Sequence, residues 1–343
     1  SNNFGASIDA SWSASQSTSR PSASVLPTST VRPLRVCSTS SGRNALPEIE
    51  FSTAGTIMRS RTGSFASMIA CASASACAPP PMSFFMMSMP PARDGTTYFN
   101  FLASHDGIGL RPVEGLLDDN ERDAMVAAMQ SFGGLVSWRT VAGGEQKPYE
   151  INIALWDACR GTVDGEDQWQ LERFICAHAV MLALEGIPGI YIHSLLGTGN
   201  DLASVEKTGR SRSINRARWD RQTLESALDD PESSHAQAFA RMSHLLAVRR
   251  LQPAFHPNAT QFTLQLRDGL FAFWRQSRSR DQCIFCVNNL TPEPQRFALA
   301  DLNLMRNEQW YDLISDQAMP DVWSELELSP YQCLWITNRP RDH

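Results

Sequence analysis

Long apolar runs are missing from this sequence of 343 residues. The longest, such as residues 177–184, are far shorter than the roughly 20 residues of a membrane-spanning helix, so we expect no membrane partner. A basic stretch followed by an apolar one, typical of a signal peptide, is also missing, and this favours a cytoplasmic protein. The net charge is −6, so an excess of basic residues is lacking too. Nucleic acid is therefore not an expected partner.

The sequence also lacks clustered metal ligands. Its eight cysteines are irregularly spaced, and only Cys283 and Cys286 form a Cys-x-x-Cys pair. That spacing suits half a zinc site or a redox pair, but no second Cys or His pair lies near it in the sequence. The pair falls in an apolar run at 282–287 that is typical of a buried strand, so we interpret both residues as reduced core cysteines. We expect neither a metal nor another cofactor.

Residues 1–95 lack lysine and contain only four carboxylates, which are Asp9, Glu48, Glu50 and Asp94. The same segment contains 21 serines, and its apolar residues show no period of 2 or 3.6. One interpretation is a low-complexity or disordered segment. A second is translation in the wrong reading frame, which we favour because the composition matches no linker or targeting type. A third is a novel partner-binding tail.

From Thr96 onward, regular patterns appear. Apolar residues recur every three or four positions at 168–185 and predict a helix. Further helices are predicted at 121–132 and 234–250, and short strands at 96–102, 152–156 and 186–193, the last beginning with a turn. Strands that alternate with helices indicate a parallel α/β layer. Only about two strand–helix units fit between 96 and 250, whereas a closed barrel needs eight.

After Pro253 the pattern changes to short strands that are separated by turn residues. The predicted strands are 261–266, 270–275, 283–288, 295–299 and 334–337. This pattern indicates a small antiparallel β sandwich over residues 251–343.

The dipeptide His105-Asp106 directly follows the predicted strand at 96–102. In a barrel, the C-terminal ends of the strands bear the reactive groups. A carboxylate there can stabilise positive charge, bind a sugar hydroxyl or hold a metal ion, and the adjacent histidine can donate to a second hydroxyl. Without further context, a plain loop pair is the simpler interpretation.

The context is specific. The run Phe99-Asn-Phe-Leu-Ala-Ser-His-Asp-Gly-Ile-Gly-Leu-Arg-Pro112 closely resembles the fourth sequence region of glycoside hydrolase family 13, the α-amylase family, in its sucrose phosphorylase subgroup. Residues 184–197 look like the eighth barrel strand of that subgroup, and Asn200-Asp201 looks like the loop after it. Residues 209–216 resemble its Gly-Arg-x-Ile-Asn-Arg element, with two extra residues. Residues 147–152 resemble the start of a loop in the branch that includes glucosylglycerate phosphorylases.

The resemblance implies the C-terminal part of a (β/α)8 barrel over 96–250, followed by the β domain. It also implies a retaining mechanism, in which one carboxylate attacks the anomeric carbon and a second protonates the leaving oxygen. Asp106 matches the third carboxylate, which stabilises the transition state and grips the sugar. His105 and Arg212 match residues that bind the same glucose, and the alternative for Arg212 is a surface arginine in a basic turn. Asn200 and Asp201 are either ligand-facing or structural loop residues.

The partners that the resemblance implies are a small α-glucoside and inorganic phosphate. Sucrose or a glucosylglycerate-like glucoside is the expected substrate, and the segments 145–149 and 156–160 are candidates for binding the group that leaves or accepts glucose. The oligomeric state is not predicted.

The nucleophile and the acid belong upstream, and there the sequence departs from the family. The family's nucleophile motif is Arg-x-Asp-Ala, and the nearest text is Ser7-Ile-Asp9-Ala10, without the arginine. Glu48 and Glu50 lie about forty residues later, where the acid is expected, but their flanking residues match nothing. The match begins abruptly near Thr96, which is a second reason to favour a wrong reading frame.

We therefore expect a retaining α-glucoside phosphorylase in a truncated, inactive copy. Two alternatives remain open. One is a non-catalytic remnant that binds sugar weakly at most, and the other is an α-glucoside hydrolase.

Overall fold

The computed structural model describes residues 48–49, 57–60, 91–93, 95–113, 117–302, 304 and 309–339. Most of the segment 1–95 lies outside the described residues, and so does the interpretation of it as disordered, of low complexity or out of frame. Asp9 and Glu50, which were weighed as nucleophile and acid, also lie outside. Glu48 begins the strand β1 (Glu48–Ile49). No strand was predicted at β2 (Ile57–Ser60).

A four-stranded sheet has the order β1-β2-β3-β9, with β3 at Thr96–Asn100 and β9 at Ile187–Pro188. Strand β3 pairs in parallel with both β2 and β9. Helix α5 (Gln170–Ala183) lies between β3 and β9 in the chain, and α9 (Ser234–Arg249) follows β9. These are the two strand–helix units that the sequence predicted.

A segment of mixed structure lies between β3 and α5. It contains β4 (Ile108–Gly109), η1 (Arg111–Val113), α3 (Asp119–Ser131), β5 (Leu135–Thr140), β6 (Gln146–Asn152), α4 (Leu155–Ala158), β7 (Gly161–Thr162) and β8 (Gly165–Glu166). Helix α3 begins at a capping box, in which Asp118 accepts from the Glu121 N–H and Glu121 accepts from the Asp118 N–H, both at 2.9 Å. Strands β4, β6 and β5 form a separate antiparallel sheet.

Two predicted strands differ from the structure. The strand predicted at 152–156 is wrong, because Asn152 ends β6 and Leu155 begins α4. The strand predicted at 186–193 is too long, since β9 ends at Pro188 and α6 (Ile192–Leu195) follows. Proline has no N–H to continue a strand ladder. The remaining elements before α9 are α7 (Leu202–Thr208), η2 (Ser211–Asn215) and α8 (Arg221–Asp229).

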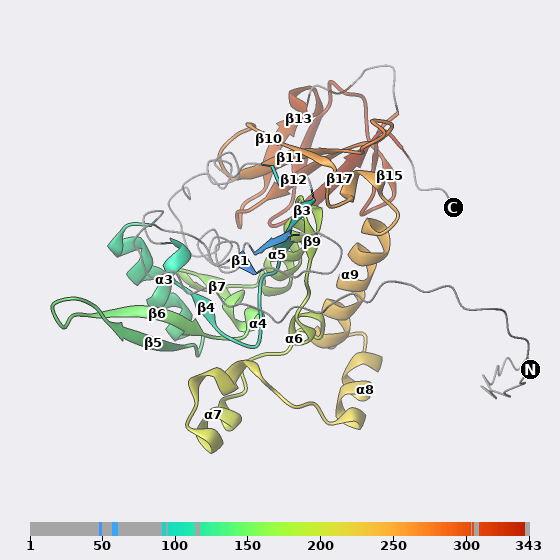
Figure 1. The fold of residues 1–343 in the computed structure, drawn as a ribbon. Coiled ribbons are helices and arrows are strands. Elements are labelled where there is room, and N and C mark those ends of the chain that lie inside the picture. The colour runs from blue at the N-terminus through green and yellow to red at the C-terminus, as the bar shows by residue number, and fades with distance from the viewer. Residues whose placement is uncertain are drawn as a thin grey trace, which may run out of the picture. The chain divides into compact units, whose positions relative to one another are not determined.

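The C-terminal strands form a six-stranded antiparallel sheet of order β10-β11-β12-β17-β14-β15, drawn in orange and red in Figure 1. A two-stranded sheet, β13–β16, accompanies it. All five predicted strands of this region are present, and β14, β15 and β16 are additional. The bounds are η3 Pro253–Phe255, β10 Thr260–Leu264, β11 Leu270–Gln276, β12 Cys283–Asn289, β13 Gln295–Ala298, η4 Leu299–Leu302, β14 Tyr311–Asp312, β15 Gln317–Ala318, β16 Glu325–Leu328 and β17 Cys333–Thr337.

The six-stranded sheet packs on both faces. Phe273 and Trp335 face α5 and α9 and share a core with residues such as Met242. On β12, Cys286 belongs to this core as well. Its neighbour Phe285 points the other way and shares a second core with Phe297 of β13. Successive side chains of a strand point to opposite faces, so the continuous apolar run of β12 serves both cores.

The same alternation separates Cys283 from Cys286. They are three positions apart on β12, so their thiols point to opposite faces of the sheet. Cys286 is buried beside the helices, whereas Cys283 is half-buried against the other core. Neither cysteine forms a disulfide within the described part of the chain, as expected, and their opposite directions separate the two sulfurs, which a shared metal ion would need close together.

Two buried arginines connect the helices to the β strands. Arg275 of β11 donates to the carbonyl of Ala183, at the end of α5, at 2.7 Å. Arg173 of α5 donates to the Tyr331 hydroxyl at 3.0 Å, and its guanidinium lies 4.5 Å from the centre of the Tyr331 ring. Across the described part of the chain, we find no helix whose length and apolar character would let it cross a membrane.

Candidate functional site

Asp106 lies in the loop that follows β3. Its carboxylate Oδ1 is 3.1 Å from Nη1 of Arg212, 3.1 Å from Nη2 of Arg216 and 3.8 Å from Nε2 of His105. The Asp106 side chain is 36% exposed. The structure thus brings together three residues that the sequence predicted, His105, Asp106 and Arg212, and it adds Arg216.

The backbone of this loop is held by η2 and by the residue after it. Nδ2 of Asn215 donates to the carbonyls of Ser104 at 2.7 Å and Asp106 at 3.0 Å. Nε of Arg216 donates to the carbonyl of His105 at 2.9 Å. We call Asn215 and Arg216 the loop clamp. Three consecutive carbonyls are bonded in this way, so the clamp fixes the direction in which Asp106 points.

Arg212 is held from the other side by Glu150 of β6. Nε of Arg212 is 3.0 Å from Oε1 of Glu150, and Nη2 is 2.8 Å from Oε2, so the pair is bidentate. Hydrogen bonding to Glu150 and its charge raise the pKa of Arg212. The Glu150 side chain is buried, whereas that of Arg212 is half-exposed. Arg212 therefore keeps Nη1 directed at Asp106 while its other nitrogens are occupied.

Asn200 and Asp201 make contacts within the protein. Oδ1 of Asn200 accepts from the Ala154 N–H at 2.8 Å, and its Nδ2 donates to the Phe132 carbonyl at 3.2 Å. Asp201 caps α7 by accepting from the Ser204 N–H at 2.9 Å. These contacts are of the structural kind that the sequence left as the alternative, and ligand binding by the two residues stays a prediction.

The segments 145–149 and 156–160 have different surroundings. Tyr149 is 40% exposed on the β5–β6 hairpin, beside Glu150. In contrast, Asp157 and Cys159 are buried, and Asp157 pairs with Arg160 at 2.6 Å. The hairpin is therefore the better placed of the two candidates for contact with a ligand, since the other is largely occupied in packing.

A cavity of about 40 Å³ lies beside Asp106, with Phe101, Ile153, Leu155 and Asn215 in its wall. That volume suits about one water molecule and is too small for a sugar ring. A sugar would have to approach Asp106 from its exposed side, where His105 is 66% exposed. Within the described ranges, no three His, Cys, Asp or Glu side chains converge as metal ligands.

The loop clamp and Glu150 were not predicted as site residues. Asn215 and Arg216 belong to the quoted 209–216 element, and Glu150 belongs to the quoted 147–152 element. Their motifs were therefore visible, but their contacts with the loop and with Arg212 were not.

Comparison with known proteins places these residues in a family. The family described as Maltogenic Amylase, C-terminal domain, matches residues 261–335. The glucosylglycerate phosphorylase of Escherichia coli is 36% identical over 241 residues, which cover 70% of this chain and 41% of that protein. That of Allomeiothermus silvanus is 38% identical over 242 residues, which cover 70% of this chain and 40% of that protein. The matched part belongs to glycoside hydrolase family 13.

Within family 13, the match falls in the subgroup of sucrose and glucosylglycerate phosphorylases, as predicted, and corresponds to its C-terminal part. The crystal structure of sucrose 6F-phosphate phosphorylase from Thermoanaerobacter thermosaccharolyticum superposes with a TM-score of 0.52 at 20% identity, over 66% of this chain and 42% of that chain. This likeness concerns the fold, which is the C-terminal part of a family 13 barrel with an all-β domain after it. The chain spans about two fifths of the length of the curated relatives that it matches.

Proposed function

We propose that this chain carries the glucose-binding end of a retaining α-glucoside phosphorylase, an enzyme that transfers glucose from an α-glucoside to inorganic phosphate. The observation that carries the proposal is the Asp106 carboxylate in the loop after β3, with Arg212 and Arg216 each at 3.1 Å. The names of the matched relatives support phosphorolysis. They also favour a small glucoside of the glucosylglycerate or sucrose type as the substrate.

In this proposal Asp106 is the transition-state stabiliser. Glycosyl transfer passes through an oxocarbenium-like state, and a fixed anion nearby lowers its free energy. The arginines keep the carboxylate in place before the sugar arrives, so little reorganisation is needed during the reaction. His105 and Arg212 are the proposed hydrogen-bond donors to the sugar hydroxyls, and Asn200 and Asp201 are proposed to border the bound ligand.

The nucleophile and the acid are proposed to be lacking in this chain, because Arg-x-Asp-Ala does not occur in the sequence and the acid is expected about forty residues after that motif. Residues 96–250 are then the last units of the catalytic barrel, and residues 251–343 are its β domain. Removal of a nucleophile from residues that act as a unit costs orders of magnitude in rate. The chain by itself is therefore proposed to bind an α-glucoside without turning it over.

One assay separates this proposal from its alternatives. The purified chain is incubated with glucosylglycerate or sucrose plus phosphate, while binding of the same glucosides is measured by calorimetry. We expect binding that Asp106→Asn weakens by about tenfold or more, since a hydrogen bond to a charged group is worth about 1.5–3 kcal/mol. The exposed Asp164→Asn is the matched control and leaves binding unchanged. We expect no glucose 1-phosphate.

Other results of the assay favour the alternatives. Glucose 1-phosphate that Asp106→Asn abolishes shows a complete active site and contradicts the inactive copy. Free glucose without phosphate dependence favours the hydrolase. Absence of binding contradicts the proposal as a whole. For residues 1–95, translation of the coding bases in the other frames tests the frame error, which predicts Arg-x-Asp-Ala followed by a strand with Glu.

A further inference from the structure

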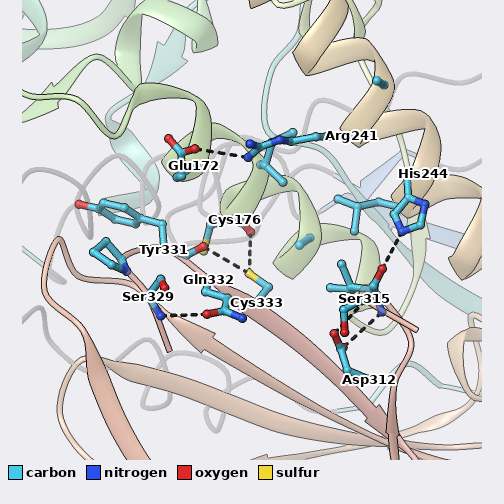
Figure 2. A pocket seen from close by; sticks show the side chains of 16 residues that line it. Glu172, Cys176, Arg241, His244, Asp312, Ser315, Ser329, Tyr331, Gln332 and Cys333 are labelled. Atoms are coloured by element: carbon cyan, nitrogen blue, oxygen red, sulfur yellow. Dashed lines mark hydrogen bonds and ion pairs between the residues drawn. The ribbon is translucent and has the colours of Figure 1, made fainter. Parts of the chain in front are cut away.

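An open cavity of about 700 Å³ lies between helices α5 and α9 and the residues around β14 and β17. Figure 2 shows its walls, with Glu172 and Arg241 at one edge and His244 at another. None of its lining residues lines the small cavity at Asp106. Two of its lining residues are cysteines, Cys176 from α5 and Cys333 from β17.

These two cysteines meet across the contact between the helix and the sheet. Sγ of Cys333 lies 4.0 Å from the carbonyl oxygen of Cys176, and Figure 2 shows the two residues facing each other. Sγ of Cys176 contacts the Asn289 carbonyl at 3.6 Å. The contact with Cys176, followed by burial, raises the pKa of the Cys333 thiol. Both side chains are free thiols, and the sulfur of Cys333 contacts the backbone of Cys176 at the wall of an open cavity.

We propose that Cys176 and Cys333 form a modification site, a dithiol that a low-molecular-weight disulfide oxidises to an intramolecular cross-link between α5 and β17. Cys333 reacts first because it is half-buried, whereas Cys176 is only 3% exposed. Its sulfur attacks one sulfur of the added disulfide, breaks that S–S bond and releases one thiol. The sulfur of Cys176 then attacks Sγ of Cys333 and displaces the second thiol.

The step balances. The two protein thiols lose two protons and two electrons, the added disulfide gains them, and two small thiols leave. The cavity matters because it provides the path by which the oxidant reaches Cys333. The other Cys pair on the sheet cannot react in this way, since Cys283 and Cys286 point to opposite faces of β12.

The test uses the full chain and bis(2-hydroxyethyl) disulfide, a small neutral oxidant. After incubation, remaining thiols are alkylated and the chain is digested with trypsin without reduction. Cys176 and Cys333 are the only cysteines of the tryptic peptides 174–207 and 307–341, whereas Cys283 and Cys286 share the peptide 281–296. We expect peptides 174–207 and 307–341 to be joined. Because the cross-link closes a long loop, we also expect the melting temperature to rise by roughly 5 °C or more.

Cys333→Ser should abolish both effects, and the matched control Cys283→Ser should keep them. Dithiothreitol should reverse the cross-link and the rise in melting temperature in the unmodified sequence, a result that does not depend on how well any variant folds. Two outcomes overturn the proposal. One is a peptide 307–341 that carries only the small-thiol adduct, and the other is a bridge within 281–296 while the other two peptides stay separate.

Discussion

Asp106 is oriented by residues more than one hundred positions later in the chain. Asn215 is 111 positions from Ser104 and 109 from Asp106, and it is buried where it bonds their carbonyls. Its own carbonyl accepts from the Tyr191 hydroxyl at 2.7 Å, so it is held in turn by the segment after β9. The direction of the carboxylate therefore depends in part on the side-chain amide of Asn215, which acts together with Arg216 and Arg212.

Removal of that amide should loosen the loop. In Asn215→Ala, the carbonyls of Ser104 and Asp106 lose their donor, and we expect a loss of about 1–3 kcal/mol of unfolding free energy. Faster amide exchange should appear in peptides that contain residues 104–107. Hydrogen exchange with mass spectrometry measures this directly. The exposed Asn258→Ala is the control and should leave those peptides unchanged; equal exchange in both variants would contradict the clamp.

A second prediction at the residue scale concerns His178 of α5. The ring lies in the core with Nδ1 at 2.8 Å from the Phe174 carbonyl, and burial lowers its pKa to about 4. In the unfolded chain the pKa is about 6.5. The unfolded state thus binds a proton between pH 6.5 and 4 that the folded state does not, so stability falls as the pH drops through that window.

The lowered pKa of His178 also sets the size of this loss of stability. Between pH 7 and pH 5, the native sequence should lose about 2 kcal/mol more unfolding free energy than His178→Gln, which has no ring to protonate. Urea unfolding at the two pH values measures the difference. Parallel pH dependence of the two proteins would show that His178 does not titrate in this way.

At the scale of elements, the ion pair of Glu150 and Arg212 joins the hairpin β5–β6 to η2. Its two side chains differ in their exposure to water. The Glu150 side chain is 7% exposed and that of Arg212 is 45% exposed. Loss of the arginine leaves a buried carboxylate without its partner, whereas loss of the carboxylate leaves a cation that water can reach.

The two substitutions should therefore differ. We expect Arg212→Gln to cost about 2–3 kcal/mol of unfolding free energy and Glu150→Gln about 1 kcal/mol. Urea unfolding of the two single variants and of the double variant gives a double-mutant cycle. We expect the double variant to lose less unfolding free energy than the two single variants added together. Equal costs for the two single variants would mean that Glu150 is solvated despite its burial.

Prediction of elements from the sequence succeeded where the pattern was long and failed where it was short. Helices α5 and α9 repeat their apolar period over 14 and 16 residues, and strands β11 and β12 are continuous apolar runs, so their sequences define them. Strands β14 and β15 have two residues each and exist only through their pairing with each other and with β17. The β5–β6 hairpin was missed because its strands are half-exposed and mostly polar, so they carry little alternation.

For the candidate site, the sequence supplied the residues but not their contacts. His105, Asp106 and Arg212 could be named because each lies in a motif that is specific to the family. The pairing of Arg212 with Glu150 spans 62 positions, and that of Arg216 with Asp106 spans 110. Such pairings depend on how the hairpin and η2 pack, which no local pattern encodes.

At the scale of the whole described structure, the β strands support the helices through Arg275. Its guanidinium is fully buried and donates to the carbonyls of Ala183 and His256 at 2.7 and 2.8 Å. The Ala183 carbonyl belongs to the last turn of α5, where a positive charge is favourable. One side chain of β11 thus satisfies a carbonyl of α5 and a carbonyl of the segment between α9 and β10.

We expect Arg275→Met to destabilise the protein by about 3 kcal/mol or more, because several buried carbonyls lose a charged donor at once. Arg296→Met on β13 is the matched control, since its pair with Glu327 is exposed to water and contributes little to stability. Chemical unfolding followed by circular dichroism compares them. A cost of Arg275→Met no larger than that of the control would show that the helices do not depend on this contact.

The contact of Arg173 with Tyr331 has a consequence for the order of events during synthesis. The two residues are 158 positions apart, and Tyr331 is among the last described residues of the chain. Helix α5 leaves the ribosome long before Tyr331, which completes its packing, has been synthesised. Until then the apolar side of α5 stays open to other nascent chains, so we expect this protein to depend on chaperones while residues 184–330 are being synthesised.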